Sequence, residues 1–168
     1  MLVWGSCHPR GEDSDFDGLF LKRDEIKGMA SDLCGKPILV EHDSAKTGSV
    51  GTIHHAWETA DSGMHVLFET DPSTFQGTLA GRLIQHGVCG ELSLGHTCKI
   101  NFSDDTLRVG EKQASEVSIV SKGDRPNTVI LGFAPSTKEK KNEYKGGSGL
   151  SLRSGSVHRA IMSEELNT

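Results

Sequence analysis

Short apolar runs that alternate with polar residues recur along most of the chain and predict a series of β-strands. The runs are separated by segments rich in Gly, Ser, Asp and Asn, which are typical of the loops between strands. The segments "ADSG" at 60–63 and "NFSDDT" at 101–106 predict two of these turns. The predicted strands cover residues 1–7, 36–42, 47–59, 63–70, 87–100, 115–121 and 127–133.

Spacings of three and four residues predict a short helix between the first two strands. Over residues 22–35, the residues Ile26, Met29 and Leu33 would share one apolar face. Gly35 directly follows that pattern and is expected to cap the helix at its C-terminus.

A second helix is predicted after the hairpin. Asp71 followed by Pro72 is typical of a helix start, because Asp accepts hydrogen bonds at the N-cap and Pro suits the first helical position. Phe75, Leu79 and Leu83 recur every four residues, so we expect them to form one buried stripe.

The elements together predict a β-rich α+β fold. We expect a single small β-barrel-like core of about six to seven mainly antiparallel strands, surrounded by a few helices. A chain of 168 residues suits one domain of ordinary size. Lys, Ser and Gly dominate toward the C-terminus with almost no apolar periodicity, so we predict a domain over 1–135 and a polar, flexible tail or linker over 136–168.

Charge and hydropathy narrow the classes of function. The chain has a formal net charge of −5 and no stripe of Lys and Arg with interleaved aromatics, which argues against nucleic-acid binding. No apolar run approaches the roughly 18–20 residues that span a bilayer, and the first residues lack the pattern of a signal peptide. We therefore expect a soluble, intracellular protein that engages neither nucleic acid nor a membrane.

The cysteine spacing favours free thiols. The four cysteines, at positions 7, 34, 89 and 98, form no Cys-x-x-Cys pair and no zinc-finger spacing. We expect no metal and no other cofactor. A zinc site assembled from distant residues such as Cys89, His96 and Cys98 stays open as an alternative.

The segment "GELSLGH" at 90–96 places a hydroxyl inside an apolar strand. Ser93 is a candidate nucleophile, because Gly95 two residues later would let a substrate backbone approach closely. His42 ends the apolar run "PILVEH" and is a candidate base where that strand meets the surface. The alternatives are an ordinary strand serine and an exposed loop histidine.

Serine hydrolysis also needs a group that orients the imidazole and donors for an oxyanion. Glu116, directly before a buried run, is either that orienting carboxylate or a solvated edge residue. His96 is the weaker candidate, because residues three apart on a strand face opposite sides. Arg125, in the turn "KGDRPN", could face an anion together with the turn's backbone amides, or else point to solvent.

Taken in order, these segments resemble the capsid maturation proteases, which are the herpesvirus assemblins and the related phage prohead proteases. The resemblance covers roughly residues 1–133 and is strongest over 36–69, 90–96 and 115–128. It consists of an apolar strand ending in His-Asp, a Gly-x-Val-Gly-like segment and a Ser-x-Gly nucleophile strand. A later strand carries the third catalytic residue and is followed by a turn.

The resemblance implies a role for each candidate residue. Ser93 takes the place of the nucleophile, His42 that of the general base and Glu116 that of the third residue. Assemblins have histidine at that third place, whereas prohead proteases often have an acidic residue, as here. The backbone amide of Asp124 would serve the oxyanion, and Arg125 would hold the oxyanion through water.

The expected function is a serine endopeptidase that cleaves scaffold and capsid precursor proteins during viral capsid maturation, with autoproteolysis. Such an enzyme would act inside the procapsid, in the host nucleus if herpesvirus-like or the host cytoplasm if phage-like. Assemblins form homodimers through helices that follow the barrel, and this chain offers only a polar tail there, so homodimerisation stays open. A catalytically inactive capsid or scaffold-binding module of the same fold is the alternative.

Overall fold

The computed structural model describes residues 1–9, 21, 23–61, 63–103 and 106–136. Apart from Ser136, the predicted tail over 136–168 lies outside these residues. No helix among the described residues has both the length and the apolar character needed to cross a membrane. The described elements are β1 (Leu2–His8), α1 (Arg23–Leu33), β2 (Pro37–Val40), β3 (Gly51–Glu58), β4 (Met64–Thr70), α2 (Phe75–Gln85), β5 (Glu91–Ser103), β6 (Thr106–Val120) and β7 (Val129–Ala134).

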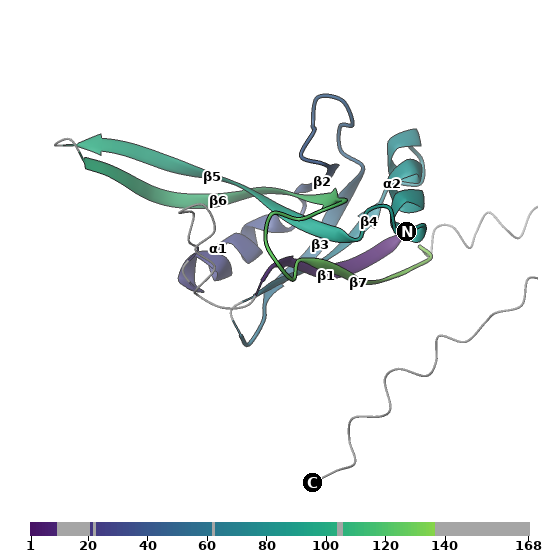
Figure 1. The fold of residues 1–168 in the computed structure, drawn as a ribbon, viewed down its shortest axis with the longest axis horizontal. Coiled ribbons are helices and arrows are strands. Elements are labelled where there is room, and N and C mark those ends of the chain that lie inside the picture. Colours follow the sequence, from purple (N-terminus) through teal and green to yellow (C-terminus); the bar gives the residue numbers. More distant parts are fainter. Residues whose placement is uncertain (10–20, 22, 62, 104–105, 137–168) are drawn as a thin grey trace, which may run out of the picture.

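The strands form one seven-stranded sheet in the order β5-β6-β2-β3-β4-β1-β7. The sheet curls into a half-barrel, from which the long β5–β6 hairpin projects (Figure 1). Neighbouring strands are antiparallel except for β2 and β6, which run parallel. β7 returns to β5, where the Ile130 N–H donates to the Gly90 carbonyl at 2.9 Å. The predicted β-rich α+β fold is confirmed.

Periodicity of apolar residues explains how the core forms. Alternate residues of β4 are buried, beginning with Met64, because successive side chains of a strand point to opposite faces. In α1 the predicted face of Ile26, Met29 and Leu33 is buried in the same core cluster, as expected. Gly35 has a φ of +79°, which is the left-handed conformation typical of the residue that ends a helix.

The second helix begins later than predicted. Thr74 is its N-cap, and the Thr74 hydroxyl accepts from the Gly77 N–H at 3.0 Å. Asp71 instead accepts the Ser73 N–H at 2.9 Å within the preceding turn. The predicted start at Asp71 is therefore wrong, because the same acceptor chemistry that caps a helix also closes a turn.

The predicted buried stripe of α2 is wrong for two of its three residues, because only Leu83 packs against the core. Phe75 is 77 % exposed and Leu79 is 43 % exposed, whereas the buried face consists of Gly77, Ala80, Gly81 and Ile84. A Cβ added to Gly77 would overlap the Asp71 carbonyl oxygen, so the helix lies close to the turn before it through a face of small residues. Apolar spacing cannot reveal such a face, because small residues contribute little to the pattern.

This orientation of α2 makes a prediction about stability. Phe75→Ala should change the free energy of unfolding by less than about 0.5 kcal/mol, because the ring is mostly in solvent. Ile84→Ala should cost about 2–4 kcal/mol, because it leaves a cavity in the core. Urea unfolding of both variants checks this, and a larger loss for Phe75→Ala would contradict the orientation.

Candidate active site

A left-handed turn after β2 positions His42. The predicted strand over 36–42 ends at Val40, and Glu41 and His42 follow with φ values of 51° and 57°. This conformation costs roughly 1 kcal/mol or more for each residue with a side chain. Two hydrogen bonds to β6 offset that cost. The Glu41 N–H donates to the Ile119 carbonyl at 3.1 Å, and the His42 N–H donates to the Ser118 hydroxyl at 3.0 Å.

The turn brings the His42 ring onto the carboxylate of Glu116. The His42 Nδ1 lies 2.6 Å from the Glu116 Oε1, and Glu116 is only 8 % exposed. With its Nδ1 hydrogen donated to the carboxylate, a neutral His42 carries its lone pair on Nε2. The hydrogen bond to Glu116 raises the pKa of His42 above its ordinary value, and partial burial opposes that rise.

Ser118 completes the support of the carboxylate. Its side chain is fully buried, and its hydroxyl donates to the Glu116 Oε2 at 2.8 Å while it accepts the His42 N–H. Sequence reasoning did not single out Ser118. The signal was present, because Glu116 and Ser118 are two polar residues at the same-face spacing in the apolar run "EVSIV".

The strand register places Ser93 on the same face of the sheet. Ser93 lies directly opposite Ser118 in the β5–β6 pair, and Gly95 lies opposite Glu116. Residues directly opposite in an antiparallel pair share a face. The neighbouring Leu92 belongs to the other face and is buried in the core. Among the described residues no hydrogen bond joins the Ser93 hydroxyl to the His42 ring, although both lie on the side of the sheet that carries Glu116.

The turn between β6 and β7 carries the two residues expected at the oxyanion. Asp124 is exposed, and its charge lies near enough to contribute to the raised pKa of His42. The guanidinium of Arg125 instead engages β1, because its Nη1 donates to the Nε2 of His8 at 3.0 Å. The turn therefore lies beside the His42–Glu116 pair. The ring of His8 on β1 holds the Arg125 guanidinium.

His8 is a buried neutral histidine, and sequence reasoning did not single it out. Its Nδ1 lies 2.8 Å from the Pro9 carbonyl and its Nε2 faces Arg125. Arginine has only donors, so Nε2 must accept and Nδ1 must carry the hydrogen. Burial lowers the pKa of His8 to about 4, and the charge of Arg125 acts in the same direction.

The other histidine and cysteine candidates do not gather into a site. His96 has its Nε2 buried without a hydrogen-bond partner among the described residues, and burial lowers its pKa. All four cysteines are free thiols. Within the described part of the chain no three His, Cys, Asp or Glu side chains are placed to hold a metal ion, so Cys89, His96 and Cys98 do not form the alternative zinc site.

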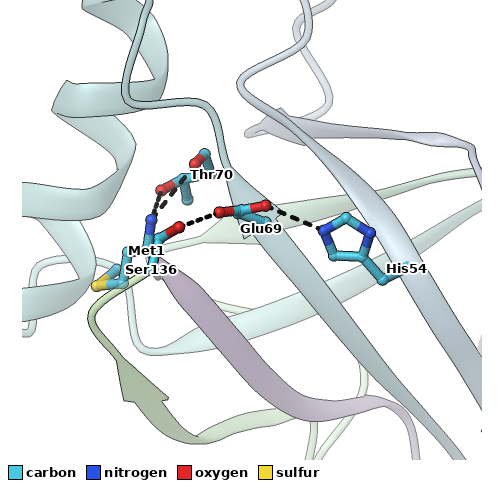
Figure 2. A network of polar contacts seen from close by, with 5 residues as sticks. All are labelled: Met1, His54, Glu69, Thr70 and Ser136. Carbon is cyan, nitrogen blue, oxygen red and sulfur yellow. Dashed lines mark hydrogen bonds and ion pairs between the residues drawn. The ribbon is translucent and has the colours of Figure 1, made fainter. Parts of the chain in front are cut away.

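A second glutamate lies between a serine and a histidine elsewhere on the sheet (Figure 2). The Ser136 hydroxyl donates to the Glu69 Oε1, and the His54 Nε2 lies 3.3 Å from the Glu69 Oε2. This order is unsuited to hydrolysis, because the histidine must lie between the serine and the carboxylate. The Met1 amino group binds Thr70 nearby, so the contacts tie the start of β1 to the end of β4.

The chain has an assemblin-like fold, which solved structures of herpesvirus proteases share. The structure of the Kaposi's sarcoma herpesvirus protease with a hexapeptide phosphonate inhibitor is similar, with a TM-score of 0.52 at 17 % identity, over 85 % of this chain and 74 % of that one. The same protease with an allosteric inhibitor gives a TM-score of 0.50 at 16 % identity, over 88 % and 85 %.

The varicella-zoster virus protease gives a TM-score of 0.48 at 17 % identity, over 77 % of this chain and 62 % of that one. No family model and no curated protein matches the sequence. At such low identity the likeness establishes the fold alone.

The contact between His42 and Glu116 predicts how the imidazole titrates. In the wild-type protein the pKa of His42 should lie above 6.5, and Glu116→Gln should lower it because the charge that stabilises the imidazolium is gone. The stabilisation from this pair is therefore present below pH 6.5 and is lost as the pH rises through the raised pKa. NMR titration of the His42 ring measures the shift. Asp32→Asn, an exposed charge on α1, is the control and should leave the titration unchanged.

The lowered pKa of buried His8 predicts that the folded protein loses stability in acid. The folded protein holds His8 neutral down to about pH 4, whereas the unfolded chain takes up the proton near 6.5. The free energy of unfolding should therefore fall by up to about 3 kcal/mol from this group as the pH drops from 6.5 to 4. His8→Gln keeps an acceptor for Arg125 but does not titrate. Unfolding curves at several pH values should show the difference between wild type and variant changing over this range, and a constant difference would rule out the buried neutral ring.

Proposed function

We propose that this chain is a serine endopeptidase with Ser93 as nucleophile, His42 as general base and Glu116 as the orienting carboxylate. The observation that carries the proposal is the 2.6 Å contact between the His42 Nδ1 and the Glu116 Oε1 on the face of the sheet that bears Ser93. The assemblin-like fold supports it, because proteases with solved structures share that fold.

The contacts of His42 suit the role of base. Glu116 fixes the tautomer that leaves Nε2 free to accept the Ser93 proton and later to deliver it to the leaving amine. The same carboxylate stabilises the imidazolium that forms when the proton moves. The hydroxyl of Ser118 prevents the carboxylate from rotating away, because it holds the second oxygen.

The turn that follows β6 is proposed to bind the oxyanion. The backbone amide of Asp124 would donate to it directly, a task that any residue other than proline can perform. Arg125 would hold it through water, and His8 would set the position of the guanidinium. Without the neutral His8, the Arg125 side chain would lose a fixed acceptor on β1.

Scaffold and capsid precursor proteins are the proposed substrates, cleaved inside the procapsid during maturation, with the chain's own precursor among them. The assemblin-like fold points to this class, and the glutamate at the third position is the form that resembles the prohead proteases.

A second candidate function is a non-catalytic capsid or scaffold-binding module. The missing hydrogen bond between Ser93 and His42 among the described residues favours it, since an inactive relative would no longer need that contact. Catalytic hydrogen bonds are often long before substrate binds, so the contact can form later. An active-site phosphonate distinguishes the two, because it labels Ser93 only if the hydroxyl is activated.

Site variants test the proposed roles. Ser93→Ala should abolish cleavage of the scaffold protein, and His42→Ala should lower kcat/KM by about 10²–10⁴-fold. Glu116→Gln should lower kcat/KM less than His42→Ala does, because glutamine keeps the shape of the side chain and removes only its charge. Incubation of the purified chain with its scaffold protein, with cuts mapped by mass spectrometry, gives the rates.

Ser31→Ala serves as the matched control. Ser31 is an exposed serine on α1, and its substitution should leave the rate unchanged. Cleavage by Ser93→Ala at the wild-type rate would end the proposal. Equal losses for Glu116→Gln and His42→Ala would refute the assigned roles.

A further inference from the structure

Gly95 lies directly opposite Glu116 in the β5–β6 pair, and the glutamate side chain lies across it. A Cβ added to Gly95 would overlap the Glu116 Oε1 and would lie 2.6 Å from the Cδ and 2.9 Å from the Cγ. Paired residues in a sheet ordinarily leave room for both side chains. Here the carboxylate itself fills the space above Gly95, so the expectation that this glycine would let a substrate backbone approach is wrong for this face of the sheet.

The backbone does not explain why this position is glycine. The described glycines with a positive φ are Gly35, Gly48 and Gly87, and Gly95 is not among them. The φ of Gly95 lies outside the left-handed region that favours glycine, so the requirement for glycine comes from the neighbouring side chain.

The carboxylate cannot move aside without losing its contacts. Its Oε1 is bonded to the His42 Nδ1 at 2.6 Å and its Oε2 to the Ser118 hydroxyl at 2.8 Å. Both bonds depend on the present position of the Glu116 side chain. Displacement of a buried carboxylate would break at least one of them, and the unpaired group would bear a desolvation cost.

We infer that Gly95 is a positioning residue, which lets the Glu116 carboxylate reach the ring of His42 by having no side chain of its own. The inference rests on the proposed function for its effect on catalysis, but its effect on the His42 ring is independent of any activity. This role also couples positions 95 and 116, because Glu116 can orient the imidazole only if the residue opposite it on β5 is glycine.

The test compares Gly95→Ala, Glu116→Ala and the double variant. Gly95→Ala alone should lower kcat/KM by about 10²-fold or more, as loss of the orienting group does. It should also lower the pKa of His42 toward its ordinary value, as followed by NMR of the ring. In the Glu116→Ala background the same substitution should change neither quantity further, because the Cβ then has nothing to displace.

Gly90→Ala is the matched control in the same segment. Gly90 is exposed, and an added Cβ there meets nothing within 4 Å, so activity and the His42 titration should stay at wild-type values. Failure of Gly95→Ala to fold while the double variant folds would support the same steric conflict. An unchanged His42 titration in folded Gly95→Ala, or a further loss of stability when Gly95→Ala is added to Glu116→Ala, would overturn the inference.

The readouts separate this inference from the proposed function. If the chain has no protease activity but the His42 titration responds to Gly95→Ala as expected, the positioning role stands and the endopeptidase proposal fails. If Ser93 and His42 are essential for cleavage but Gly95→Ala keeps full activity, the endopeptidase proposal stands and the positioning role fails.

Discussion

The candidate site depends on the hydrogen bond between the His42 ring and the Glu116 carboxylate, which is buried and bonded at both of its oxygens. It fixes the tautomer and direction of the His42 ring, and it requires a glycine on the facing strand. A buried carboxylate with unsatisfied oxygens would be costly, so the hydroxyl of Ser118 supports the arrangement by satisfying the oxygen that the imidazole does not bind. These contacts place the candidate site on β6 and on its two neighbours in the sheet, β2 and β5.

The parallel pairing of β2 with β6 makes that contact possible. His42 and Glu116 are separated by 74 positions in the chain, and they meet because Val40 pairs with Ile119 on the neighbouring strand. After the left-handed turn at Glu41 and His42, the ring of His42 contacts Glu116, which precedes Ile119 on β6. Strain in that turn is compensated by hydrogen bonds to the same strand that carries the carboxylate.

Much of the fold could be predicted from the sequence, because strands and α1 are built from apolar residues with a clear period. The hairpin of β3 and β4 and the buried face of Ile26, Met29 and Leu33 follow from that period alone. Helix α2 shows where the rule fails. Its buried face is made largely of small residues, and its large residues Phe75 and Leu79 are exposed. The close approach of the helix backbone to the preceding turn decides which face of α2 is buried. The spacing of apolar residues does not encode that approach.

For the candidate site, the sequence by itself determined which groups are available: a serine in an apolar strand, a histidine after a second strand and a glutamate before a third. Their family resemblance suggested an order of roles. Only the tertiary structure decided that His42 and Glu116 touch, that Ser118 holds the other oxygen, and that His8 holds Arg125. The physical reason is that strand pairing and register are set by contacts across the whole sheet, whereas a local pattern specifies only the face on which each side chain lies.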